Sequence, residues 1–147
     1  MTTIAQLLNR KGATVHTVAP DTLLHEAIST MVHLGIGALV VKAHSSDDLL
    51  GILAERDILQ RLANGAAYDT ALVCDCMSDS LPSITGTHNT NDALQIMTDR
   101  RIRHLPVLDN DGRLLGLVSI GDLVKAKLEE QHQAIEQLGN YIGGIPT

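Results

Sequence analysis

The sequence predicts an α+β fold in which two β-α-β-β-α repeats pack about a pseudo-two-fold axis, with a helical segment at each end of the chain. Three observations carry this prediction. One pattern of apolar and polar residues occurs twice, helical spacing alternates with short strand-like runs, and 147 residues suffice for about one ordinary domain or two very small ones. Because one repeat of this size buries its sheet face poorly, the two copies are expected to share one core.

The internal repeat becomes visible when the chain is shifted by 66 residues. After a loop that is one residue shorter in the second copy, the shift is 65 residues. Chance similarity of two apolar patterns would not also keep glycine and aspartate at matching offsets. The matched pairs are Val18 and Ile84, Glu26 and Asp92, Ala27 and Ala93, Ile28 and Leu94, Met31 and Met97, Ile36 and Ile102, Leu39 and Leu105, Val41 and Val107, Gly51 and Gly116, and Asp57 and Asp122.

The first copy begins with a short strand near 15–18, and Asp21 or Thr22 is expected to supply the N-cap of the helix that follows. This helix carries its apolar residues at a spacing of three and four. They are Leu24, Ala27, Ile28 and Met31. Two strands at 38–41 and 49–53 come next with a polar turn between them, and a closing helix begins at about Glu55.

The second copy has the same order of elements. A short strand at 83–85 precedes an N-cap at Asn89 or Asn91 and an amphipathic helix that contains Ala93, Leu94 and Met97. Strands at 105–108 and 114–118 follow, joined by a turn at 109–112, and the last helix of the repeat begins at about Ile120. The chain is therefore divided into an N-terminal helical segment (1–11), repeat 1 (12–66), a linker (67–82), repeat 2 (83–128) and a C-terminal helix and tail (129–147).

Both terminal segments carry a narrow apolar seam. In the C-terminal helix, Leu128, Ile135, Leu138 and Ile142 follow spacings of 7, 3 and 4, and Gly139 with Gly143-Gly144 is expected to end it. The N-terminal seam consists of Ile4, Leu7 and Leu8. Such seams are typical of helices that pack on a partner, so we expect a homodimer contact. The alternative is that both ends fold back on their own chain.

Composition excludes several classes of protein. The net charge is −6, and the chain has two Tyr, no Phe and no Trp, so neither a basic face for nucleic acid nor an aromatic platform for bases is expected. No segment resembles a signal peptide or a membrane span. The only cysteines, Cys74 and Cys76, are too close together for a disulfide framework or a tetrahedral metal site, and they indicate a reducing cytoplasm.

Two segments of the second copy, Arg103-His104-Leu105-Pro106-Val107 and 116–122 (GLVSIGD), resemble the cystathionine β-synthase (CBS) domain. The resemblance covers about 12–128, and a tandem pair of such domains is called a Bateman module. It implies a regulatory module without catalytic residues or metal. The implied ligand is an adenine nucleotide (AMP, ADP, ATP or NAD) bound between the copies. The resemblance also implies dimerisation of the pair.

Within that family each site is built from both copies. Carried over to this sequence, site A joins the ribose-binding Ser119 and Asp122 to base-binding backbone at His16, Thr17, Val18, Gly37, Ala38 and Leu39. Site B joins Asp57 to Pro82, Ser83, Ile84 and the segment Arg103-His104-Leu105. The resemblance implies that Arg103 and His104 hold phosphates in the central cavity that the two sites share, and Arg56 is a further candidate.

Two features weigh on this assignment. Ser119-x-x-Asp122 is also a capping-box pattern, in which Ser and the acidic residue bond each other's backbone amides. Ala54 stands where the family has Ser or Thr, so site B lacks one ribose contact and site A is favoured for ribose. Without aromatic rings, a bound base would lie between aliphatic side chains such as Leu39, Leu105 and Ile84.

The sequence therefore predicts a cytoplasmic sensor that binds an adenine nucleotide and acts on an unidentified regulated protein. One alternative is a constitutive dimerisation or adaptor protein with a vestigial pocket, which Ala54 favours. The other is an enzyme with Asp57 or Asp122 as its base beside His104.

Overall fold

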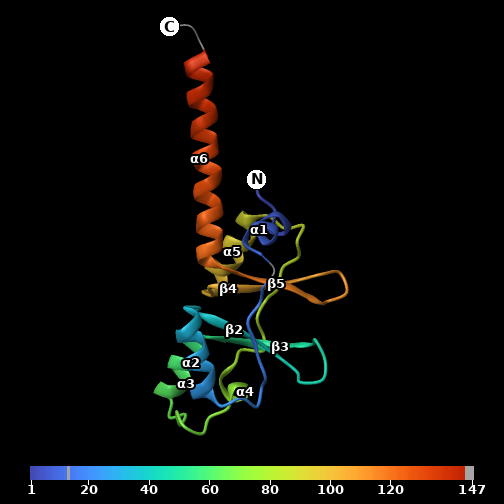
Figure 1. Cartoon of the computed structure of the whole chain (residues 1–147), viewed down its shortest axis with the longest axis vertical. Coiled ribbons are helices and arrows are strands. Elements are labelled where there is room, and N and C mark those ends of the chain that lie inside the picture. The colour runs from blue at the N-terminus through green and yellow to red at the C-terminus, as the bar shows by residue number, and fades with distance from the viewer. Residues whose placement is uncertain (13, 145–147) are drawn as a thin grey trace.

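Two small sheets form the centres of the two repeats in the computed structural model, which describes residues 1–12 and 14–144, with side chains up to 139 (Figure 1). In repeat 1, β1 (Thr17–Val18) lies parallel to β2 (Ala38–Lys42), and β2 pairs antiparallel with β3 (Leu49–Ala54). In repeat 2, β4 (His104–Leu108) pairs antiparallel with β5 (Leu114–Ser119). The α+β class and both hairpins are confirmed.

The register of the two sheets repeats with the offset found in the sequence. Leu39 opposes Leu53 in repeat 1, and Leu105 opposes Val118 in repeat 2. Both hairpins also contain an irregularity at the same place, between Val41 and Lys42 and between Val107 and Leu108. The strand expected at 83–85 is shorter than predicted, since only Ile84 forms a parallel bridge, to Val107. This bridge is the counterpart of the Val18–Val41 pairing.

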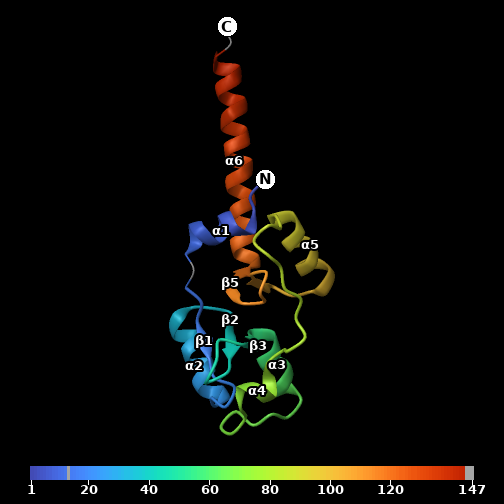
Figure 2. The ribbon, with the colours of Figure 1, turned by 90° about the vertical axis from the view of Figure 1, so that its right-hand side faces the viewer.

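Two helices flank each sheet. In repeat 1 these are α2 (Leu24–Leu34) and α3 (Glu55–Ala63), and in repeat 2 they are α5 (Thr90–Arg100) and α6 (Ile120–Gly144). The repeats stack one above the other, with α6 extending away from both (Figures 1 and 2).

Each repeat is completed by a helix that the sequence places elsewhere. Helix α1 (Ile4–Lys11) precedes repeat 1 but packs on repeat 2, whereas α4 (Val73–Cys76), in the segment expected to be a linker, packs on repeat 1 (Figure 2). The hydrogen bonds at their N-termini match: Ile4 N donates to His88 O at 2.8 Å, and Val73 N donates to Thr22 O at 2.9 Å. The acceptors, Thr22 and His88, are related by the repeat, so α1 and α4 are structural counterparts.

These crossing helices explain why the expected single core is wrong. The structure contains two buried aliphatic clusters, one in each repeat. Ile4, Leu7 and Leu8 of α1 belong to the cluster of repeat 2, and Val73 and Cys76 of α4 belong to that of repeat 1. Each helix covers apolar surface that would otherwise have to be buried against the other repeat. The N-terminal seam therefore packs on its own chain and is not a dimer contact.

The same contacts correct one expected helix start. Helix α2 begins at Leu24, after an N-cap at Leu23 that has no side-chain bond, rather than after Asp21 or Thr22. Its first amide donates to Ala71 O at 2.7 Å, so the segment before α4 performs the capping that a polar side chain was expected to provide. Asn89 caps α5 as predicted, because its side chain accepts from Asp92 N.

Helix α6 joins the closing helix of repeat 2 to the predicted C-terminal helix without a break. The expectation that Gly139 ends the helix is wrong, because the helix continues to Gly144. Leu128, Ile135 and Leu138 are each more than 60% exposed, whereas the side chain of Ile142 and the tail at 145–147 lie outside the described residues. Within the described ranges, no helix is long and apolar enough to span a membrane.

Glycines at matched positions of the two sheets should respond differently to an added methyl group. A Cβ at Gly51 would lie 2.5 Å from the backbone oxygen of Ser78, but at Gly116 it would lie 2.8 Å from a methyl of Leu8. The backbone at Ser78 cannot move aside as readily as a methyl of Leu8. Gly51→Ala should therefore lower the free energy of unfolding by about 1–3 kcal/mol. Gly116→Ala should lower it by less than about 1 kcal/mol, as measured by urea denaturation.

Gly121→Ala is the matched control, because the nearest atom to its Cβ is 3.7 Å away. In the first turn of α6 it should be neutral or stabilising by up to about 1 kcal/mol. Equal losses for Gly51→Ala and Gly116→Ala would contradict the different surroundings of the two glycines.

Candidate functional site

Two cavities lie where the strand-to-helix turns of one repeat face the other repeat. Cavity A, of about 300 Å³, contains the predicted residues His16, Gly37, Ala38, Ser119 and Asp122. Cavity B, of about 400 Å³, contains Asp57, Arg56 and Arg103, and Gly37 and His104 line both cavities. Cavity B also contains Ala54, at the position that the sequence assigned to site B. The lining residues that the sequence interpretation missed are Lys11, Thr14, Val15, Gly35, Ile36 and Leu117 in cavity A and Ile52, Glu55, Leu59, Leu81, Arg101 and Ile102 in cavity B.

Both expected ribose carboxylates serve as helix caps. Asp122 accepts from Ser119 N at 2.9 Å, and Asp122 N donates back to Ser119 Oγ at 3.2 Å, which is the reciprocal capping box. In cavity B, Asp57 accepts from Ala54 N at 3.0 Å, but Ala54 has no side-chain oxygen to return the bond. A carboxylate can accept about four hydrogen bonds, so a cap does not by itself prevent ligand binding.

The two carboxylates differ in a second partner. Lys11, from the last turn of α1, places its Nζ 2.6 Å from Asp122 Oδ2 and 2.8 Å from Leu117 O. Partial burial would raise the pKa of the Asp122 carboxyl. The hydrogen bonds from Lys11 and from the Ser119 amide, together with the Lys11 charge, outweigh burial and hold this pKa below its usual value. Asp122 is therefore a carboxylate that already has a cation.

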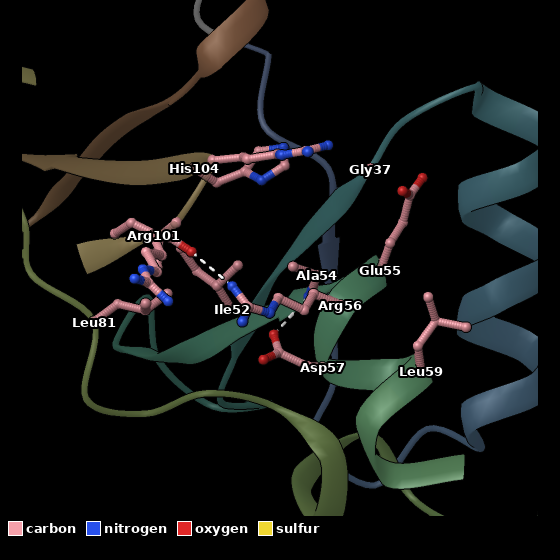
Figure 3. A pocket seen from close by; sticks show the side chains of 12 residues that line it. Gly37, Ile52, Ala54, Glu55, Arg56, Asp57, Leu59, Leu81, Arg101 and His104 are labelled. Carbon is pink, nitrogen blue, oxygen red and sulfur yellow. Dashed lines mark hydrogen bonds between the residues drawn. The ribbon is translucent and has the colours of Figure 1, made fainter. Parts of the chain in front are cut away.

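Arginine side chains gather at cavity B. Arg56, Arg101 and Arg103 all line it. Arg56 Nη1 donates to Arg101 O at 2.9 Å (Figure 3). Arg101 takes the left-handed conformation at φ 55°, where its counterpart Gly35 has φ 66°. Arg101 is the C-cap residue of α5, and it also lines the cavity.

His104 separates the two cavities and lies beside Gly37 (Figure 3). A Cβ at Gly37 would come 3.5 Å from His104 Cε1. Burial lowers the pKa of His104, although the nearby carboxylates of Asp122 and Glu55 partly oppose this effect. The lowered pKa favours the neutral form of the ring.

Several predicted base-binding residues line neither cavity. They are Thr17, Val18, Leu39, Pro82, Ser83, Ile84 and Leu105. Leu39, Ile84 and Leu105 are at most 2% exposed and belong to the two cores, so the expectation that these side chains sandwich a base is wrong. Leu81 lines cavity B instead, at the position that the repeat relates to Val15 in cavity A. The 66-residue shift could have identified this pair.

Comparison with known proteins gives one family across most of the chain. The family model described as CBS domain matches residues 5–64 and 73–129. Both matched segments include the helix that crosses to the other repeat.

Three similar proteins illustrate the family. The chain is 36% identical to the CBS domain-containing protein CBSX3, mitochondrial, of Arabidopsis thaliana, over 97% of this chain and 73% of that protein. A solved CBS-domain protein from Agrobacterium tumefaciens is 41% identical with a TM-score of 0.80, over 86% of this chain and 93% of its own. The structure of CBSX2 in complex with AMP is 25% identical with a TM-score of 0.70, over 89% of this chain and 99% of its own.

The two strand-to-helix turns predict opposite effects of one hydroxyl group on stability. Ser119→Ala removes a cap from α6 and should lower the free energy of unfolding by about 1 kcal/mol. Ala54→Ser supplies α3 with the missing acceptor and should raise it by about 0.5–1 kcal/mol. Both are measured by urea denaturation of the ligand-free protein. A loss of stability in both variants would contradict the capping geometry at Ala54.

Proposed function

This chain belongs to the CBS domain family, and from that premise we propose that it binds an adenine nucleotide in cavity B. The observation that carries the proposal is the convergence of Arg56, Arg101 and Arg103 on the same cavity as the carboxylate of Asp57. A ligand that unites an anionic end with vicinal hydroxyl groups matches this set, because guanidinium binds phosphate and carboxylate accepts from hydroxyls.

The parts of the nucleotide are assigned by chemistry. Asp57 accepts from the ribose hydroxyls, and the arginines hold the phosphates. Leu81 and Ile102 supply apolar walls for the adenine ring. The AMP complex of CBSX2 supports an adenosine ligand in this family, and AMP, ADP, ATP and NAD are the candidates for this chain.

Cavity B is preferred over cavity A, in contrast to the ranking that the sequence suggested. Ala54 removes one ribose contact from cavity B, but cavity B is larger and its three arginines have no counterparts in cavity A. At the matching positions cavity A carries Gly35 and Gly37, and its Lys11 is paired with Asp122.

A regulatory role accompanies binding in this proposal. Stand-alone CBS proteins are in general non-catalytic modules that bind nucleotides and dimerise, and we extend these properties to this chain. The ligand would act by binding two conformations, or two states of a homodimer, with different affinity, and so change the affinity for a regulated protein. The adaptor alternative rests on Ala54 and predicts no nucleotide binding. A cytoplasmic setting stays a prediction.

Arginine replacement tests the phosphate assignment. Arg103→Ala should weaken AMP binding about 10- to 100-fold, since a hydrogen bond to a charged group contributes about 1.5–3 kcal/mol. Adenosine, which lacks the phosphate, should lose less than about threefold on the same scale. Calorimetric titration with both ligands measures the two effects.

Arg100→Ala provides the matched control, because this neighbouring arginine is exposed on α5 outside cavity B. It should leave both affinities unchanged. Equal weakening of AMP and adenosine by Arg103→Ala would remove the phosphate role. A thermal-shift panel of AMP, ADP, ATP and NAD with no shift for any member would favour the adaptor alternative.

The lowered pKa of His104 sets the pH range in which nucleotide affinity changes. Because the neutral ring is favoured in the free protein, the midpoint of its protonation lies below the ordinary pKa of about 6.5. The contribution of His104 to AMP affinity should therefore rise by about tenfold as the pH falls from 7.5 towards 5, when the imidazolium adds a charge-assisted bond.

The His104→Asn variant should lack this gain in AMP affinity at low pH. Titration of the phosphate itself affects the wild-type protein and the variant equally, so it cancels when their affinities are compared at each pH. Calorimetry across the pH range measures it. Identical pH profiles for the two proteins would show that His104 does not contact the phosphate.

A further inference from the structure

We propose that Lys11 keeps cavity A closed to nucleotide, so that each chain binds one nucleotide, in cavity B. The inference rests on the proposed function and adds the stoichiometry and the residue that sets it. Lys11 lies outside both repeats as the sequence defines them, and it reaches cavity A only because α1 crosses to repeat 2.

The ammonium group of Lys11 satisfies two acceptors at once. It bonds Asp122 Oδ2 at 2.6 Å and Leu117 O at 2.8 Å, and the Lys11 and Asp122 side chains are only 33% and 24% exposed. The Lys11 ammonium and the Ser119 amide both bond Oδ2, so a ribose hydroxyl that bonds this oxygen would have to displace a partly desolvated cation. A neutral hydroxyl forms a weaker bond to a carboxylate than an ammonium does, so the exchange is unfavourable.

The pseudo-two-fold axis provides an internal comparison. The counterpart of Leu117 O is Ile52 O, which accepts from the backbone amide of Ser78 at 2.9 Å. In repeat 1 a backbone amide therefore bonds the strand carbonyl whose counterpart in repeat 2 is bonded by the Lys11 side chain. Within the described residues, Asp57 forms no ion pair, so a ligand that reaches it displaces no cation, whereas at Asp122 the Lys11 ammonium occupies Oδ2. The two carboxylates differ because different chain segments cover the sheet edges.

Helix α1 holds Lys11 in place. Leu7 and Leu8, one turn before it, are buried in the core of repeat 2, and Arg10 pairs with Glu129 of α6 at 3.7 Å. The lysine therefore extends from a fixed helix end. Its removal should leave α1 docked and expose Asp122.

The experiment counts adenosine molecules per chain by calorimetric titration of the wild-type protein, Lys11→Ala and Asp57→Ala. Adenosine is the probe because cavity A contains no arginine for a phosphate. We expect one site in the wild-type protein, two in Lys11→Ala and none in Asp57→Ala. The double variant Lys11→Ala/Asp57→Ala should again bind one. Lys11→Met, which keeps the apolar stem, should behave as Lys11→Ala if α1 stays folded.

Arg10→Ala is the matched control. It removes a cation from the same turn of α1, but Arg10 does not line cavity A. It should keep one site. Two sites in the wild-type protein, or one site in both Lys11 variants, would overturn the inference while leaving nucleotide binding intact. No binding by the wild-type protein, with one site in Lys11→Ala, would instead overturn the proposed function of cavity B and support closure by Lys11.

Discussion

The fold depends on the exchange of leading helices between the repeats. Each repeat has a sheet face that its own β-α-β-β-α unit leaves open, and the helix that covers it comes from the segment preceding the other repeat. The amide donors at the start of α1 reach carbonyls at 86 and 88, and those at the start of α4 reach the matching carbonyls at 20 and 22. Because these donors would otherwise be unpaired helix ends, the exchange satisfies polar groups and buries apolar surface together.

This exchange brings two equivalent cavities together on a frame that is nearly symmetric, and side chains then make them unequal. Gly35 is matched by Arg101, Gly37 by Arg103 and Ala54 by Ser119. Cavity B is thus lined by arginines. Cavity A contains the complete Ser119–Asp122 capping box and the Lys11 ammonium that pairs with Asp122. Arg101 adopts a left-handed backbone that a non-glycine residue takes only at a cost of roughly 1 kcal/mol, and its side chain points to the cavity that we assign to the nucleotide.

Sequence reasoning recovered what local spacing encodes. The repeat offset, both hairpins, the starts of α3 and α6 and the Asn89 cap follow from periodicity and residue type, and the family resemblance is confirmed. It missed what only tertiary contacts decide. Nothing near Asp21 signals that Ala71 O will receive the first amide of α2, and nothing near Lys11 signals a contact 111 residues away. The ligand roles of the predicted site residues stay predictions.

Helix α6 begins at the wall of cavity A, the cavity that Lys11 closes, and extends from it as a long arm. Its first residues form the wall of cavity A that holds Asp122, and its 25 residues give an arm of about 37 Å at 1.5 Å per residue. A rotation of roughly 5° at that base would displace the far end by about 3 Å on this length. A rearrangement too small to alter the packing of either core would therefore be magnified at the tip, where another molecule could sense it without approaching the cavities.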